Sequence, residues 1–294
     1  MISFAKAHAC GNDFLIITEE DAADFDKGEL TRQLCARNTG IGADGIEFFS
    51  WTGEHSGRIR LYNANGSVAE ISGNGTRCVV AWMASERDAH SGDQFSIDTD
   101  AGPRISTIQD FRHSEISGPT VFVTTDMGVP EFAEHSVELS DGTRIDGIRV
   151  SMGNPHFVIV QSHNDLDRSW EEIGEEICLH PDFPDQTNVE FVNILGSQSV
   201  NILGSQSEPI RQIGIRIFER GVGPTSSSGT GTSAAATAMI GVYHAETELE
   251  VVAPGGMQTV RWEGPGEKLY LTGPATLVAR GEAWAAEILP GDIG

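Results

Sequence analysis

The sequence is poor in positive charge and has no long apolar segment. Its 294 residues carry a net charge of −24, and they include only three lysines, Lys6, Lys27 and Lys268. Nucleic-acid binding needs a basic surface, so this composition argues against a nucleic-acid partner. No apolar run approaches the roughly 18 residues needed to cross a membrane, and the start "MISFAKAHAC" lacks the long apolar stretch of a secretory signal. We therefore expect no membrane partner.

Cysteine is scarce and irregularly placed. Cys10, Cys35, Cys78 and Cys178 form no Cys-x-x-Cys pair and show no spacing typical of a metal site. We interpret them as reduced thiols, and we expect a cytoplasmic protein without a metal. The length allows one large domain or two of ordinary size.

Strand-like segments outnumber helical ones. Alternating apolar and β-branched residues predict strands over 14–18, 57–63, 121–128, 156–160, 188–195, 213–218, 247–254, 259–262 and 268–273. Helices are expected over 29–37, 74–87, 168–178 and 229–243. Many strands and few helices favour an α+β fold over alternating βαβ units.

One eight-residue string, "VNILGSQS", occurs twice in tandem, at 192–199 and 200–207. A repeat this short is not a solenoid unit. Its glycine, serine and glutamine predict a lengthened hairpin connection, and we assign it no catalytic role.

A second internal likeness is more informative. The segment "YNANGSVAEISGNGTRCVVAWMA" (62–84) can be laid over "FERGVGPTSSSGTGTSAAATAMI" (218–240). In each, an aromatic residue ends a strand and a polar residue follows, Asn63 or Glu219. A serine comes nine residues later, Ser72 or Ser228, followed by Gly-x-Gly-Thr and an apolar helix. This pattern predicts two similar domains with a boundary near 115–120.

Each glycine turn is predicted to offer an anion site. Glycine lets the backbone approach a ligand closely, and the first amides of a helix point outward at the positive end of its dipole. Two such turns facing across a domain cleft can grip one carboxylate. They would hold Ser72 and Ser228 on opposite faces of the neighbouring carbon, which suits inversion by one group that removes a proton and one that delivers it.

At these residues the sequence resembles the diaminopimelate epimerase family. The likeness is carried by "FAKAHACGNDFLII" (4–17), "RNTGIGADGI" (37–46), "YNANGSVAEISGNGTRC" (62–78), "SMGNPHFVIV" (151–160), "NVEFV" (188–192) and "RIFERGVGPTSSSGTG" (216–231). Enzymes of this family invert one α-carbon of a symmetrical diamino diacid without a cofactor, in lysine and cell-wall synthesis. The resemblance implies two pseudo-symmetric α/β domains, each with a sheet around a central helix, and an active site in the cleft between them. We place these domains at 1–118 with 276–294, and at 119–275.

The resemblance also implies roles for individual residues. The positions that match substrate-holding residues are Asn12, Asn63, Asn154, Asn188 and Arg220. The amides of Gly73, Asn74, Gly229 and Thr230 match the grip on the reacting carboxylate. His156 and Glu219 match polar residues beside the catalytic pair and the reacting amine.

Several of these residues also have purely structural interpretations. The asparagines can be turn formers, His156 a core histidine, and Glu219 with Arg220 a solvated pair. Six blocks in family order favour the binding interpretation. Arginine also suits the role implied for Arg220, because its guanidinium can clamp a carboxylate with two hydrogen bonds.

The sequence departs from the family at the two decisive positions. The family's acid and base are cysteines, one in each glycine turn, whereas this chain has Ser72 and Ser228 there. A cysteine thiol has a pKa of about 8.5, lowered further at a helix start, so thiolate is available near neutrality. A serine hydroxyl ionises far less readily. His156 can assist one serine, and each serine also suits a helix N-cap, worth about 1 kcal/mol.

Three explanations for the serines remain open. The chain can be an engineered double Cys→Ser form, a natural relative that acts on a more acidic substrate, or a binding protein without catalysis. Pro224 stands where the family usually has an acid, which slightly favours a natural variant.

The function we predict is cofactor-independent epimerisation of an amino diacid, most simply LL- and meso-diaminopimelate. The alternatives are an isomerase of a different small carboxylate and a catalytically inactive amino-acid-binding homologue. Pyridoxal phosphate is not expected, because none of the three lysines stands in a phosphate-cradle context. Some members of the family form homodimers, and the sequence leaves the oligomeric state open.

Overall fold

The computed structural model describes residues 1–69, 72–100, 102–112, 118–160, 169–195 and 209–285. The chain divides into two compact units, residues 1–125 with the chain from 273 onward, and residues 126–272. The sequence placed the divisions at 118/119 and 275/276. The first division lies later in the structure because strand β8 (Thr120–Gly128) pairs with β7 (Gly102–Arg112) as far as Thr125. No helix among the described residues is long and apolar enough to span a membrane.

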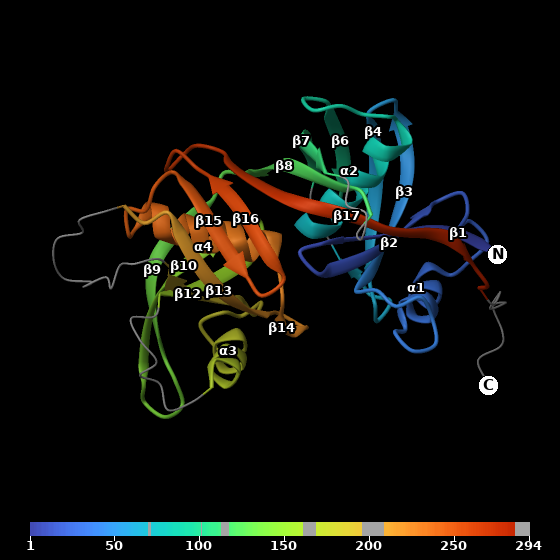
Figure 1. Ribbon diagram of the computed structural model, residues 1–294. Helices are drawn as coiled ribbons and strands as arrows, with labels where there is room; N and C mark the ends of the chain where they lie inside the picture. The colour runs from blue at the N-terminus through green and yellow to red at the C-terminus, as the bar shows by residue number, and fades with distance from the viewer. Residues whose placement is uncertain (70–71, 101, 113–117, 161–168, 196–208, 286–294) are drawn as a thin grey trace, which may run out of the picture. The chain divides into compact units, whose positions relative to one another are not determined.

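The first unit is a closed barrel of strands around one helix (Figure 1). Besides β7 and β8, its strands are β1 (Ile2–Ala9), β2 (Asn12–Thr18), β3 (Gly45–Gly53), β4 (Ser56–Asn63), β6 (Gln94–Thr99) and β17 (Leu269–Ala283), with the short β5 (Val68–Ala69) beside β4. The pairing order is β1–β2–β3–β4–β6–β7–β8–β17 and back to β1, and the pairs β2–β3 and β4–β6 are parallel.

Helix α2 (Gly73–Glu86) fills this barrel, and α1 (Lys27–Cys35) covers its outside. The inner core joins α2 residues such as Val79 and Met83 to inward-facing strand residues such as Phe49. Leu30 of α1 packs with Ile46 in a separate cluster. Alternate residues of β3 thus face α2 and α1, as the two-residue period of a strand requires.

The second unit repeats this plan around helix α4 (Gly229–Gly241), as Figure 1 shows. Its strands are β9 (Glu131–Glu138), β10 (Arg144–Ser151), β11 (Pro155–Val160), β12 (Asn188–Ile194), β13 (Gln212–Glu219), β14 (Gly223–Thr225), β15 (Glu248–Ala253) and β16 (Gly256–Arg261). They pair in the order β9–β10–β11–β12–β13–β15–β16–β17, with β11–β12 and β13–β15 parallel. Helix α3 (Trp170–Cys178) packs on the outside, as α1 does in the first unit.

All four predicted helices and all nine predicted strand segments occur. Their end points differ by a few residues, except that the strand predicted over 268–273 extends to Ala283 as β17. The pattern missed β1, β3, β5, β6, β7, β9, β10 and β14, which include charged or glycine-interrupted stretches such as "EFAEHSVE" and "GPRISTIQDFR". Most of the tandem repeat lies outside the described residues, and only its first residues take part in β12.

A tight turn between β1 and β2 sets the position of Asn12. Cys10 and Gly11 both have positive φ, 52° and 82°, and the strand pairing runs up to Ala9 and Asn12 on either side. Two consecutive positive φ values define the type I′ turn that suits the twist of a hairpin. Asn12 therefore stands at the first position of β2, at the end of the barrel where the turn lies.

Candidate active site

Each glycine turn starts a central helix with a serine as its N-cap. Ser72 has extended backbone angles, and its Oγ accepts a hydrogen bond from the Gly75 amide at 3.0 Å. Ser228 does the same for the Gly231 amide at 3.1 Å. The two turns therefore share one local geometry, and both hydroxyls already satisfy amides that a helix start leaves without a partner.

The second glycine of each turn lies against a buried glutamate. A Cβ at Gly75 would stand 2.0 Å from Glu47 Oε1, and a Cβ at Gly231 would stand 2.8 Å from Glu190 Oε1. Both glutamates are fully buried, and each is the third residue of its strand, β3 or β12. The close approach explains why both helices have glycine at this position.

In the second unit a hydrogen-bonded series leads from the buried glutamate to the serine. Glu190 Oε1 lies 2.8 Å from His156 Nδ1, and His156 Nε2 lies 3.1 Å from Asn154 Oδ1. Asn154 donates to Thr230 Oγ1 at 3.4 Å, and that hydroxyl is 3.4 Å from Ser228 Oγ. Because the Asn154 oxygen accepts from Nε2, His156 and Glu190 share the proton between Nδ1 and Oε1.

The pair between His156 and Glu190 is wholly enclosed. Neither side chain has exposed surface. Burial raises the pKa of Glu190, and the adjacent His156 opposes part of that effect. A buried carboxyl of this kind is retained because its partner supplies a hydrogen bond that water cannot.

The remaining predicted residues of the second unit gather beside this series. Asn188 donates to the Pro155 carbonyl at 3.1 Å and accepts from the Arg220 amide at 2.9 Å. The Arg220 guanidinium is exposed and donates to the Asp185 carbonyl at 2.8 Å. Glu219 ends β13 and is partly exposed. The positive charge of Arg220 thus lies at the surface, and its side chain donates to an uncharged backbone carbonyl.

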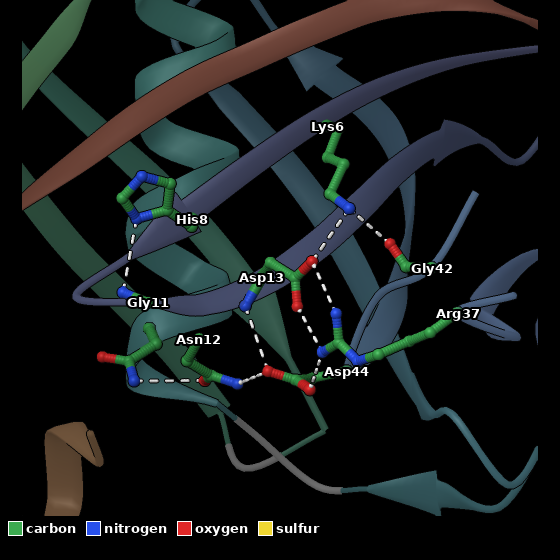
Figure 2. Close-up of polar contacts among 9 residues, drawn as sticks. Lys6, His8, Gly11, Asn12, Asp13, Arg37, Gly42 and Asp44 are labelled. Carbon is green, nitrogen blue, oxygen red and sulfur yellow. Dashed lines mark hydrogen bonds and ion pairs between the residues drawn. The ribbon is translucent and has the colours of Figure 1, made fainter. Parts of the chain in front are cut away.

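In the first unit, different residues form the hydrogen-bonded series beside the glycine turn. Asn74 Nδ2 donates to Asn12 Oδ1 at 3.1 Å, and Asn12 Nδ2 donates to Asp44 Oδ2 at 2.6 Å. Figure 2 shows Arg37 reaching both Asp44 and Asp13, at 2.7 and 2.9 Å. These contacts fix which way the Asn12 amide points.

Lys6 completes this cluster from β1. Its ammonium lies 2.9 Å from Asp13 Oδ2 and also donates to the Gly42 carbonyl (Figure 2). Burial alone would raise the pKa of Asp13, but hydrogen bonds from Arg37 and Lys6 hold it below its ordinary value. Lys6 therefore has a structural role here as the counter-charge of a carboxylate.

Asn63 is placed near this end of the barrel but turns its side chain elsewhere. It ends β4, opposite Gly45 of β3, and its Nδ2 donates to Ser67 Oγ at 3.1 Å. Its side chain is exposed. A hydrogen bond thus connects Asn12 to Asn74 at the start of α2, where Ser72 and Gly73 also lie. The Asn63 side chain instead forms a hydrogen bond within its own turn.

Two buried charges of the first unit were not predicted. Neither oxygen of Glu47 has a hydrogen-bond partner within the described ranges, and burial raises its pKa to about 8. Arg77 is fully buried and donates to Asn74 Oδ1 at 2.5 Å, and its Nε and Nη1 find no partner in the same part of the chain. An acid inside an apolar strand, as in "GIEFF" and "NVEFV", was the available signal for Glu47 and Glu190. Nothing comparable marked Arg77.

A separate pocket of about 770 Å³ lies in the second unit along β9 and β10. Its lining includes Glu134, His135, Asp146 and Tyr243. The predicted site residues are not part of this lining, so the pocket does not bear on the chemistry of the glycine turns.

Comparison with known proteins identifies the family. A model described as diaminopimelate epimerase matches residues 4–133 and 148–278. The diaminopimelate epimerase of Halothermothrix orenii is 33% identical over 96% of this chain and 97% of its own, and that of Thermosynechococcus vestitus is 34% identical over 95% and 98%.

Solved structures show the same fold at low sequence identity. A probable proline racemase from Agrobacterium radiobacter has a TM-score of 0.67 at 14% identity, covering 99% of this chain and 95% of its own. A hydroxyproline epimerase from Agrobacterium vitis has a TM-score of 0.64 at 14% identity, covering 95% and 91%. The fold is therefore the two-domain, mixed α and β architecture of these proteins, and the chain belongs to the diaminopimelate epimerase family of isomerases.

Proposed function

We propose that this chain is built to bind diaminopimelate and to interconvert its LL and meso forms without a cofactor. The observation that carries the proposal is the pair of matched turns, each with an N-cap serine at the position where the family has its acid or base. Family membership supplies the substrate, since the relatives named above are diaminopimelate epimerases.

The proposed chemistry is proton exchange at the α-carbon. One turn position removes the α-proton, and the other returns a proton, which inverts the centre. The amides at Gly73, Asn74, Gly229 and Thr230 stabilise the carboxylate, on which negative charge builds as the proton leaves. Asn12, Asn63, Asn154, Asn188 and Arg220 hold the rest of the amino diacid.

The two units supply different support for this chemistry. The buried pair of His156 and Glu190 is linked to Ser228 by hydrogen bonds through Asn154 and Thr230, and we propose that this series orients the Ser228 hydroxyl. Among the described residues, no such series connects Ser72 to Glu47, whose oxygens lack hydrogen-bond partners there. We propose that a serine at either position makes proton removal slow, because a hydroxyl yields far less base than a thiol.

A second candidate is a binding protein without turnover. It is favoured by one observation, that both serine hydroxyls serve as acceptors for helix amides. The third candidate, isomerisation of a different small carboxylate, has no specific contact in its favour.

Hydrogen exchange in deuterium oxide tests these candidates. LL- and meso-diaminopimelate are incubated with the chain, and α-deuterium is read by mass spectrometry alongside binding by calorimetry. We expect binding of both isomers and exchange far slower than a cysteine-bearing relative shows. Absence of binding in the folded protein would refute the proposed substrate, and binding with no exchange after long incubation would select the binding protein.

A further inference from the structure

The most unusual charge in the described part of the molecule is Arg77. It is fully buried in the first turns of α2, and its Nε and Nη1 have no hydrogen-bond partner among the described residues. Its Nη2 holds Asn74 Oδ1 at 2.5 Å, so the guanidinium folds back along the first turn of the helix. An unpaired buried cation is expensive, and such groups are retained where a counter-charge arrives.

The neighbouring groups of the first unit do not supply that counter-charge. Burial raises the pKa of Cys78 and of Glu47, the latter to about 8, so both hold their protons near neutrality. Within the described residues, no carboxylate forms an ion pair with Arg77. The ion pairs of this unit are made by other cations, such as Lys6, Lys27, Arg32 and Arg37. Among the described residues, the positive charge of Arg77 thus has no ion-pair partner beside the start of α2.

The second unit has no equivalent charge. The residue five positions after its N-cap is Ser233, which is buried and donates to the Gly229 carbonyl at 2.9 Å. Arg77 stands five positions after Ser72. The two turns therefore share an amide geometry but differ by one full positive charge.

We propose that Arg77 is a positioning residue for a carboxylate bound at the first turn of α2. The guanidinium fixes the Asn74 side chain, which in turn holds Asn12, and its charge favours an anion at the helix start beyond what the amides supply. Inside a poorly polarisable core this charge acts over several ångströms. The inference rests on the proposed function for the identity of the ligand, but the site itself requires only a carboxylate.

Calorimetry with meso-diaminopimelate and its diamide tests the role of the charge. Arg77→Gln is expected to weaken binding of the diacid about tenfold or more, because it removes a full positive charge held in a poorly polarisable core beside the bound carboxylate. The diamide lacks both carboxylates and keeps its ammonium groups, so the same change should not weaken its binding by more than about twofold. Ser233→Ala, the matched change on α4, should leave both affinities within about twofold.

A merely structural role would give a different pattern. Equal losses for the diacid and the diamide in a folded Arg77→Gln protein, or no loss for either, would overturn the inference. Circular dichroism and the melting temperature establish that each variant is folded.

A second measurement uses the unchanged protein and does not depend on diaminopimelate. The Arg77 Nε–H resonance, assigned by its loss in Arg77→Lys, is followed by nitrogen NMR while propanoate or propanamide is added. We expect a shift with propanoate alone; a shift with both or with neither refutes the carboxylate site. If diaminopimelate does not bind but propanoate shifts the resonance, the proposed substrate fails and the Arg77 site stands.

Discussion

The two units place the same backbone feature in two different polar settings. Each has a parallel strand pair, a buried glutamate at the third position of the second strand, and a serine-capped helix that starts with glycine. In the second unit the neighbouring strand faces Glu190 with His156. In the first unit the corresponding residue is Phe14, by the register of β2 with β3, and no described residue forms a hydrogen bond with Glu47.

The two units share one backbone plan but differ in the polar side chains around their glycine turns. The N-cap, the glycine and the buried acid recur in both units, so they belong to the shared architecture. The partners of the acid and the charge inside the helix start do not recur. The two proposed acid and base positions therefore have unequal surroundings, and substitutions that make them more alike test whether that inequality matters.

The largest effect is expected from placing thiols at both turns. The double change Ser72→Cys and Ser228→Cys should raise α-deuterium exchange by about a thousandfold or more, since the pKa of a thiol is several units below that of a hydroxyl and each unit is worth about 1.4 kcal/mol. Each single change should exchange the α-proton of one isomer without inverting it, because one base then removes and returns the proton. Mass spectrometry with chiral separation measures both quantities.

Two results would contradict this prediction. Exchange that stays at the background rate in a folded double variant would show that the turns do not act on this substrate. Full inversion by either single variant would show that the remaining serine is a competent partner.

Making the second unit like the first should lower stability. His156→Phe copies Phe14 and leaves Glu190 buried without its 2.8 Å partner. Breaking a buried pair in this way costs about 3 kcal/mol. Urea unfolding at pH 7 measures the loss.

The double change His156→Phe with Glu190→Leu is the control for this prediction. Replacing both partners removes the unpaired carboxyl, so part of the loss should be recovered. A double variant less stable than the single one would mean that the pair is not the source of the effect.

Glu47 should make stability depend on pH. Its folded pKa of about 8 lies above the ordinary value, so the folded state binds the proton more tightly than the unfolded chain. The stabilising contribution is then fully present below about pH 4 and is lost as the pH rises through about 8. Glu47→Gln should be close to the parent at pH 4 and more stable by about 4 kcal/mol at pH 8.

Thermal or urea unfolding across this pH range measures the difference. Glu54→Gln changes an exposed glutamate and should leave the pH profile parallel to that of the parent. A Glu47→Gln profile that also runs parallel would show that Glu47 is not the titrating group.

The sequence was sufficient for the framework and insufficient for the contacts inside it. The repeat of Ser72 and Ser228 before Gly-x-Gly-Thr predicted both helix starts, because capping and glycine chemistry are local. The register that puts His156 opposite Asn188, two residues before Glu190, and Phe14 opposite Gly45, two residues before Glu47, is not local. It depends on pairing between strands far apart in the chain, which periodicity alone does not specify.

The contacts of Arg77 and Asp44 could not be predicted for the same reason. Arg77 occupies a position of α2 that an apolar pattern would assign to the core, and only the folded barrel shows that its Nε and Nη1 have no hydrogen-bond partner among the described residues. Asp44 was part of a quoted motif, yet its hold on Asn12 follows from β2 and β3 lying side by side. Polar partners across strands are the part of a site that a single sequence leaves open.

The smallest expected effect concerns the two serines as helix caps. Ser72→Ala and Ser228→Ala should each lower the free energy of unfolding by about 1 kcal/mol, whereas Ser→Gly at either position should lower it by only a few tenths. Both hydroxyls accept from the third helical residue at nearly the same distance, 3.0 and 3.1 Å, so the two losses should match. Unequal losses would mean that the partners of one turn, such as Thr230 beside Ser228, contribute to its cap. A fall in diaminopimelate affinity in Ser→Gly variants, which keep the cap nearly intact, would show that the hydroxyls contact the ligand in addition to starting the helices.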